Sequence, residues 1–328
     1  MQARPIDEDA IQRAVEALRR GGLVAMPTET VYGLAADARS DAAVRAVFAA
    51  KGRPPDHPVI VHVPGVEAFV DWAVDVPPSA QALAAAFWPG PLTLVLKRRP
   101  EVSNLVTGGQ DTVGLRCPAH PWARALLQRF GAVVAPSANR FGRISPTTAQ
   151  HVMDDLGQKP AGAVDVVLDG GPCPVGIEST ILDLSGPSPR LLRPGAVSRE
   201  QIEAVLGVHV AAADAASPRA PGRLEKHYAP RTPLELVPAG ELAARVSALQ
   251  STPVAVLAPA WAARSAPNLR LHLIAPEDPA EYARVLYQHL RRLDASGAQR
   301  LLVAAPPTGP EWEAVADRLQ RASAGSAA

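Results

Sequence analysis

The sequence predicts an α/β protein of two domains, and three observations support that prediction. Short apolar segments rich in β-branched residues alternate with segments of helical period along most of the 328 residues. This alternation is irregular up to residue 208 and regular from residue 234 onward. Residues 209–233 lie between, rich in proline and small residues and without apolar periodicity. We therefore expect domains at 1–208 and 234–322, joined by a linker at 209–233.

The first helix and the turn after it open the larger domain. Ile11, Val15 and Leu18 share one helical face, acidic residues stand at its start, and two glycines end it. A buried strand at 23–26, the turn PTET and a second short strand follow. A helix at 41–51 comes next, and we expect Asp41 to cap it.

The rest of the larger domain mixes strands and helices without a fixed order, which indicates a mixed sheet. We expect strands at 59–63, 92–97, 112–117, 132–136, 164–169, 179–184 and 190–195, and helices at 79–88, 120–130, 147–156 and 199–206.

The smaller domain alternates cleanly, which is typical of a parallel, doubly wound (Rossmann-like) sheet. Its strands have no glycine-rich phosphate loop after them, so we assign it no nucleotide site. Its expected strands lie at 234–237, 253–259, 269–274 and 300–305, and its expected helices at 239–249, 279–294 and 311–321.

Composition excludes several classes of protein. Hydrophobic residues make up 47% of the chain and the formal net charge is +1, which argues against disorder and against a global preference for polyanions. Cys117 and Cys173 are too few for a disulfide framework or a cysteine zinc cage. No apolar run reaches the roughly 18–20 residues of a membrane span, and the N-terminus has no signal-peptide core, so we expect a cytoplasmic protein without membrane contact.

Two polar clusters lie in the first third of the chain. Thr28, Glu29 and Thr30 follow the strand at 23–26; a small polar ligand could bind there, although an ordinary hydroxyl turn with a solvated Glu29 is the favoured local interpretation. Lys51 and Arg53 end the helix at 41–51. They suit a polyphosphate, or they merely complement the helix dipole.

Two residues near strand ends carry a positive or titratable group. His62 lies within the strand at 59–63, where a single histidine is more often structural than functional. Arg116 ends an apolar strand, so its charge needs a partner, and a ligand carboxylate would be a fitting bidentate one.

Hydroxyls and cations recur at two later strand ends. The segment 135–147 carries Ser137, Asn139, Ser145 and Thr147 with Arg140 and Arg143, and donors at a helix start favour anions. It lacks the glycines of a nucleophile elbow, which argues against a serine hydrolase. Ser179, Thr180 and Arg193 form the last cluster.

Motifs along residues 8–235 resemble, in order and spacing, the YrdC-like family. These motifs are PTETVYGL (27–34), KGRP (51–54), VIVHV (59–63), PGPLT (89–93), TVGLRCPAHP (112–121), APSANRFGRISPT (135–147), GIESTILDL (176–184) and LLRPG (191–195). HYAPRTPL (227–234) and the domain after it resemble the longer, two-domain threonylcarbamoyl-AMP synthases of that family.

The resemblance implies a nucleotidyltransferase that combines L-threonine, bicarbonate and ATP into threonylcarbamoyl-AMP and pyrophosphate. It implies Mg²⁺ held mainly by the ATP phosphates, without a protein cage. It also implies a downstream transferase complex that modifies tRNA beside the anticodon.

The resemblance also assigns residues. The threonine-binding set comprises Thr28, His62, Arg116 (on the carboxylate), Ala135 (through its backbone) and Ser179. The ATP set comprises Lys51, Arg53, His57, Thr112, Ser137, Ser145 and Arg193, with His57 standing where the family usually has asparagine. His227 and Tyr228 of the linker are candidates for a lid, and Glu29 receives no role.

Two other functions compete with this one. A tRNA- or double-stranded-RNA-binding module without catalysis would use the same cations on phosphates, but aromatic residues are only 4% of the chain and form no stacking platform. Weak tRNA binding by the enzyme itself stays open. Carbamoyl-adenylate-forming relatives of hydrogenase maturation carry cysteine-rich zinc segments, which two cysteines cannot supply.

Overall fold

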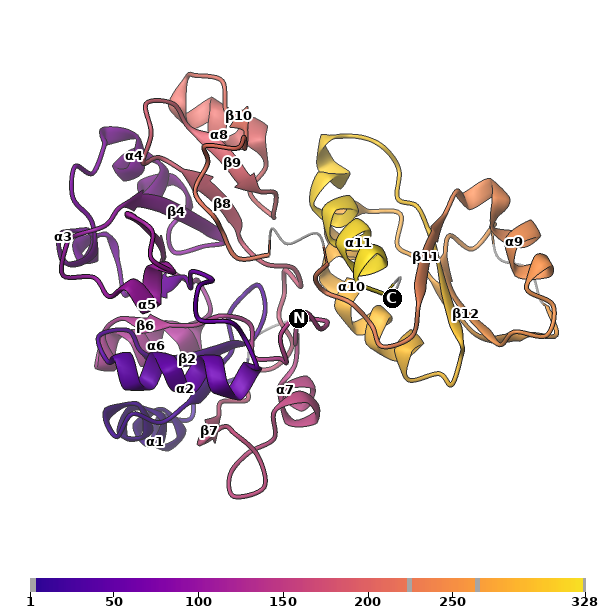
Figure 1. Ribbon diagram of the computed structural model, residues 1–328, viewed down its shortest axis with the longest axis horizontal. Helices are drawn as coiled ribbons and strands as arrows, with labels where there is room; N and C mark the ends of the chain where they lie inside the picture. The colour runs from indigo at the N-terminus through magenta and orange to yellow at the C-terminus, as the bar shows by residue number, and fades with distance from the viewer. Residues whose placement is uncertain (1–3, 223–225, 263–265, 327–328) are drawn as a thin grey trace. The chain divides into compact units, whose positions relative to one another are not determined.

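The computed structural model describes residues 4–222, 226–262 and 266–326 and separates the chain into two compact units (Figure 1). Unit 1 comprises residues 1–141 and 145–223, and unit 2 comprises residues 142–144 and 224–328. The first part of the expected linker joins the sheet of unit 1, because β10 (Ala211–Ala212) pairs with β9 (Arg190–Arg193). Residues 223–225 of that linker lie outside the described residues.

A mixed sheet forms the centre of unit 1, in the order β10-β9-β8-β4-β5-β3-β6-β2-β1-β7. The sheet contains parallel pairs such as β4–β8 and antiparallel pairs such as β4–β5, which confirms the expected mixed α/β fold. The remaining strands are β1 (Val24–Met26), β2 (Gly33–Asp37), β3 (Val61–His62), β4 (Leu92–Lys97), β5 (Thr112–Arg116), β6 (Val133–Val134), β7 (Val166–Val167) and β8 (Thr180–Asp183).

Helices cover both faces of this sheet, because its strands alternate between two hydrophobic cores. Val24 and Met26 pack with α1 and α6, whereas Ala25 between them belongs to the core that contains α2 and α4. The helices of unit 1 are α1 (Glu8–Arg19), α2 (Asp41–Lys51), α3 (Phe69–Trp72), α4 (Pro78–Phe87), α5 (Asn104–Thr107), α6 (Pro121–Phe130), α7 (Ala149–Asp155) and α8 (Arg199–Leu206).

Most expected elements of unit 1 are present, with three differences. The cap of α2 is Ser40 and not Asp41: the Ser40 hydroxyl accepts from the backbone of Ala43 at 3.3 Å, and Asp41 is the first helical residue. The strands expected at 59–63, 132–136 and 164–169 are only two residues long, since their flanks leave the ladder to form loops. The short helices α3 and α5 were not expected.

Unit 2 is a parallel sheet in the order β11-β14-β12-β13, as the sequence predicts. Figure 1 shows α10 and α11 on one side of this sheet and α9 on the other, which is the doubly wound arrangement. Its elements are β11 (Leu234–Val237), α9 (Leu242–Ala248), β12 (Val254–Ala258), β13 (Leu269–Ile274), α10 (Pro279–Asp294), β14 (Arg300–Ala304) and α11 (Glu313–Ser326). Within the described ranges, no helix has both the length and the apolar character needed to span a bilayer.

A reciprocal cap at the start of α8 supports a stability prediction. The Ser198 hydroxyl accepts from the Gln201 backbone at 3.3 Å, and the Gln201 side chain accepts from the Ser198 backbone at 2.8 Å. Ser198→Ala leaves one helix-end donor unpaired, so we expect the free energy of unfolding of unit 1 to fall by about 1 kcal/mol. Urea unfolding of the full chain measures this. Ser247→Ala on an exposed position of α9 is the control, with an expected change within about 0.5 kcal/mol; equal midpoints for the two variants would contradict the prediction.

Candidate active site at the strand ends of unit 1

Two of the polar loops are joined by backbone hydrogen bonds. The loop after β1 meets the loop after β6: Leu34 donates to Pro136 at 2.7 Å, and Ala138 donates to the Tyr32 carbonyl at 2.8 Å. A Cβ at Gly33 would lie 3.0 Å from the Cβ of Ala135, so the missing side chain allows this close approach. Residues 27–34 and residues 135–147 are therefore in direct contact.

Thr28 makes the hydroxyl turn that its local sequence favours. Its Oγ1 donates to the Val31 carbonyl at 2.6 Å and accepts from the backbone of Thr30 and of Val31 at 3.2 Å. The hydroxyls of Thr28 and Thr30 also lie 2.9 Å apart. The expectation of a solvated Glu29 in this turn is wrong, because Glu29 is buried.

Glu29 pairs with Arg116 inside the unit. The Arg116 Nη2 lies 2.6 Å from Glu29 Oε1, and the two side chains are 4% and 8% exposed. The other carboxylate oxygen of Glu29 accepts from the backbone of Ala119 at 2.9 Å. Arg116 also donates to the Thr30 hydroxyl at 2.9 Å and to the Gly90 carbonyl at 3.3 Å. The charge that ends β5 thus has a protein partner that sequence reasoning missed.

His62 lies beside Arg116, because β3 and β5 pair in parallel with these two residues in register. Burial, reinforced by the positive charge of Arg116, lowers the pKa of His62 to about 3. The imidazole is therefore neutral near pH 7 and acts as a hydrogen-bonding group, not as a cation.

Lys51 ends α2 and points into the loop after β6. Its ammonium donates to the Ser137 carbonyl and, at 2.7 Å, to the Asn139 carbonyl. Burial and the nearby Arg53 hold the pKa of Lys51 well below its usual range. The lysine therefore connects α2 to the loop that carries Ser137 and Ser145.

Arg53 and His57 lie in the loop that follows Lys51. The Arg53 guanidinium donates to the Pro58 carbonyl at 2.7 Å and stands 5.9 Å from the Phe141 ring. The His57 ring is 5.6 Å from the same ring, and burial followed by the charge of Arg53 lowers the pKa of His57. Phe141 thus holds two residues of the expected ATP set together.

The last two clusters are adjacent in space. The Ser145 hydroxyl donates to the buried Glu178 carboxylate at 2.5 Å. Ser179, the next residue, lies 2.8 Å from the Thr93 hydroxyl and accepts from Arg193 through its carbonyl at 2.8 Å. Arg193, from the ATP set, is therefore in direct contact with Ser179, from the threonine set.

Three further residues of the expected site remain to be placed: Thr112 in unit 1, and His227 and Tyr228 in unit 2. Thr112 begins β5, about 13 Å from Arg116 at the other end of the strand by the usual rise per residue. His227 and Tyr228 belong to unit 2. There the Tyr228 ring packs against His227 and Tyr287, at 4.1 and 5.6 Å between ring centroids, and only 1% of Tyr228 is exposed.

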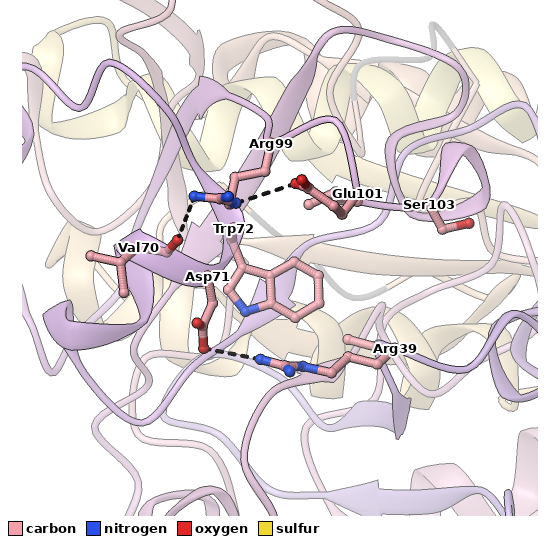
Figure 2. Close-up of a pocket in the computed structure, with 9 residues that line it drawn as sticks. Arg39, Val70, Asp71, Trp72, Arg99, Glu101 and Ser103 are labelled. Atoms are coloured by element: carbon pink, nitrogen blue, oxygen red, sulfur yellow. Dashed lines mark hydrogen bonds and ion pairs between the residues drawn. The ribbon is translucent and has the colours of Figure 1, made fainter.

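A cavity of about 520 Å³ lies elsewhere in unit 1 and contains none of the expected site residues. Figure 2 shows its wall, where Arg39 pairs with Asp71 at 2.9 Å and Arg99 with Glu101 at 3.3 Å around Trp72. These pairs are solvent-exposed, and each cation is already balanced by a carboxylate.

Sequence reasoning missed Glu29 and Glu178 as structural parts of the site. Glu29 had no usable local signal, since its turn sequence favours a solvated carboxylate. Glu178 had a weak one, as the only charged residue in GIEST. Among the described residues, no three acidic, histidine or cysteine side chains gather as metal ligands.

Comparison with known proteins identifies the family. A family model described as telomere recombination (Sua5/YciO/YrdC) matches residues 16–195, and one described as threonylcarbamoyl-AMP synthase, C-terminal domain, matches residues 197–324.

Individual relatives agree with these models. The threonylcarbamoyl-AMP synthase of Bacillus subtilis is 44% identical over 70% of this chain and 67% of its own length. That of Schizosaccharomyces pombe is 34% identical over 96% and 88%. The crystal structure of Pyrococcus abyssi Sua5 complexed with L-threonine is 36% identical, covers 98% of this chain and 96% of its own, and superposes with a TM-score of 0.88. The chain therefore belongs to the threonylcarbamoyl-AMP synthase family, in its two-domain form.

Proposed function

We propose that this chain joins L-threonine, bicarbonate and ATP into threonylcarbamoyl-AMP and releases pyrophosphate. The observation that supports this most directly is the buried Arg116, placed among the hydroxyls of Thr28 and Thr30 at the edge of a loop system that also holds Lys51. A guanidinium in that position fits the carboxylate of an amino acid.

The hydrogen-bond donors of Arg116 also support the binding of a substrate carboxylate. A guanidinium has five N–H groups. In Arg116, Nη2 donates one to Glu29, Nη1 donates one to Thr30 and Nε donates its single one to Gly90. With respect to the described residues, one N–H remains on each terminal nitrogen, the number that a bidentate carboxylate requires. The neutral His62, the Ala135 backbone, Thr28 and Ser179 would surround the rest of the threonine.

The nucleotide would lie along the cations of the neighbouring loops. Lys51, Arg53 and Arg193 would balance the phosphates, with Ser137, Ser145, Thr112 and His57 as further contacts. Mg²⁺ would enter on the ATP phosphates, because Glu29 and Glu178 already bond to Arg116 and Ser145 and leave no carboxylate set for a protein cage.

These residues would position reactants and would not attack them. Threonine and bicarbonate form a carbamate with loss of water, and an oxygen of that carbamate displaces pyrophosphate from the α-phosphorus of ATP. Such a carbamate is a weak and unstable nucleophile, so the enzyme must align it and exclude water. Fixed cations and hydroxyls also stabilise the charge that develops on the phosphate oxygens. The product would pass to a downstream complex that modifies tRNA.

The linker residues would serve as a lid. Within unit 2, Tyr228 is buried and the Arg318 guanidinium lies 5.4 Å from its ring. We keep His227 and Tyr228 in this role as a proposal that rests on the family resemblance.

Isotope exchange tests the reaction. We expect exchange of labelled pyrophosphate into ATP only when threonine and bicarbonate are both present, since only the complete carbamate can accept the adenylyl group. Omission of each component in turn is the control. Exchange of equal rate without threonine would overturn the substrate assignment.

The lowered pKa of Lys51 predicts a pH dependence of ATP binding. The protonated ammonium attracts phosphate. Because the pKa of Lys51 is lowered, its ammonium loses the proton, and with it this attraction, at a lower pH than an ordinary lysine does. We expect the Kd for ATP to rise with pH at values below those at which an ordinary lysine titrates. Calorimetric titrations of wild type and Lys51→Met measure it: the variant should bind at least tenfold more weakly at pH 7 and lose this slope. An unchanged slope in the variant would assign it to another group.

Truncation tests the lid. A chain that ends at residue 222 keeps β10 and the Pro221 carbonyl, which accepts from Arg193 at 3.0 Å, but it lacks His227 and Tyr228. We expect its pyrophosphate exchange to fall at least tenfold while its circular dichroism remains that of a folded α/β unit. Full retained turnover would show that the lid is dispensable.

A further inference from the structure

Glu29 is the carboxylate most deeply placed in the threonine side of the site, and the family resemblance gives it no role. Its side chain is 8% exposed and, among the residues that the structure describes, bonds to two groups, the Arg116 guanidinium and the Ala119 backbone. We propose that Glu29 is a positioning residue that aims Arg116 at the carboxylate of the amino-acid substrate. This inference rests on the proposed function and deepens it.

Glu29 connects three separate loops around that arginine. Its carboxylate joins the loop after β1 to Arg116 and to Ala119, which follows β5. Its own carbonyl accepts from the backbone of Val175 at 2.8 Å, in the segment before β8. The buried carboxylate holds the first two segments through its bonds to Arg116 and to the Ala119 backbone, and the main chain of Glu29 holds the third. A flexible side chain could not keep these segments in register.

The contacts of Arg116 determine the direction in which it can bind a ligand. Glu29, Thr30 and Gly90 each engage a different nitrogen, so rotation of the guanidinium would break at least one buried hydrogen bond. The pair of N–H groups that remains therefore has one orientation. A bidentate carboxylate contact depends on that orientation, whereas a point-charge attraction does not.

Charge balance gives Glu29 a second task. An arginine that is 4% exposed carries a large desolvation cost unless a partner shares its environment. Glu29 supplies that partner at 2.6 Å, so Arg116 stays in place and charged whether or not a substrate carboxylate is present. The site is thereby preorganised, and threonine binding does not have to order the guanidinium.

Glu29→Gln is the direct test, because it keeps the shape and removes the charge and the acceptor that faces Ala119. We expect the Kd for L-threonine to rise at least tenfold. We expect the Kd for L-threoninamide, which has no carboxylate, to change less than twofold, so the preference for acid over amide collapses. The affinity for ATP should also stay within twofold. A purely structural role would weaken all three ligands together.

Glu101→Gln is the matched control. It makes the same chemical change in an exposed Glu–Arg pair of the same unit, 3.3 Å from Arg99 (Figure 2). Exposed pairs contribute little, so its threonine and ATP affinities should equal those of wild type.

Thr30→Val keeps the test decisive if Glu29→Gln does not fold. It removes the hydroxyl that accepts from the Arg116 guanidinium. We expect threonine affinity to fall two- to fivefold and threoninamide affinity to stay unchanged. Thr30→Ser retains the hydroxyl and should restore the threonine affinity. Failure of wild type to bind threonine at all would refute the proposed function. A different result would overturn the role of Glu29 and leave the proposed function standing. In that result wild type binds threonine normally and Glu29→Gln binds it equally well or more tightly, because the carboxylate of Glu29 competes with the substrate.

Discussion

The buried ion pair between Arg116 and Glu29 is the interaction on which the site depends. An unpaired guanidinium at the end of an apolar strand would be too costly to bury, and an exposed one would be mobile. Glu29 reaches it from the loop after β1 and also accepts the Ala119 backbone hydrogen bond. Two loops that are about 90 residues apart in the chain are thereby fixed against each other. The same pair sets the electrostatics nearby, because the charge of Arg116 helps to keep His62 neutral.

Lys51 shows the same principle on the other side of the site. Its ammonium is bonded to backbone carbonyls of the loop after β6, so it determines the loop conformation as well as the local charge. Burial lowers its pKa, which means that the protein maintains this cation at an electrostatic cost. A buried cation is poorly hydrated, and its attraction for a phosphate is correspondingly stronger than that of a surface lysine.

Regular elements were predictable from the sequence because they depend on local periodicity. The strand at 92–97 and the helices at 199–206 and 279–294 agree with the structure at both ends. β3 and β6 were overestimated, because their apolar flanks are buried by loops and not by further ladder pairing. Pairing of this kind depends on chain segments distant in sequence, which local patterns do not encode.

The candidate site was predictable to a different extent. Residue type and position at the end of a strand or helix were enough to select Arg116, Lys51 and Ser179 as candidates. The partners of these residues were not predictable, since the Arg116–Glu29 pair spans 87 positions and the Ser145–Glu178 pair spans 33. For Glu29 the local pattern pointed the wrong way, because a threonine-flanked glutamate in a turn is usually solvated.

The contact between Ser179 and Arg193 explains how such a site could serve a reaction that consists mainly of alignment. Arg193 is bonded to both the carbonyl and the hydroxyl of Ser179, and a Cβ at the neighbouring Gly195 would lie only 2.4 Å from the Thr180 nitrogen. The segments that would hold the amino acid and the nucleotide are therefore packed backbone to backbone and cannot shift independently. In-line attack on a phosphorus atom is sensitive to displacements of about 1 Å. The bond from Arg193, of the expected ATP set, to Ser179, of the expected threonine set, limits that displacement without adding any reactive group.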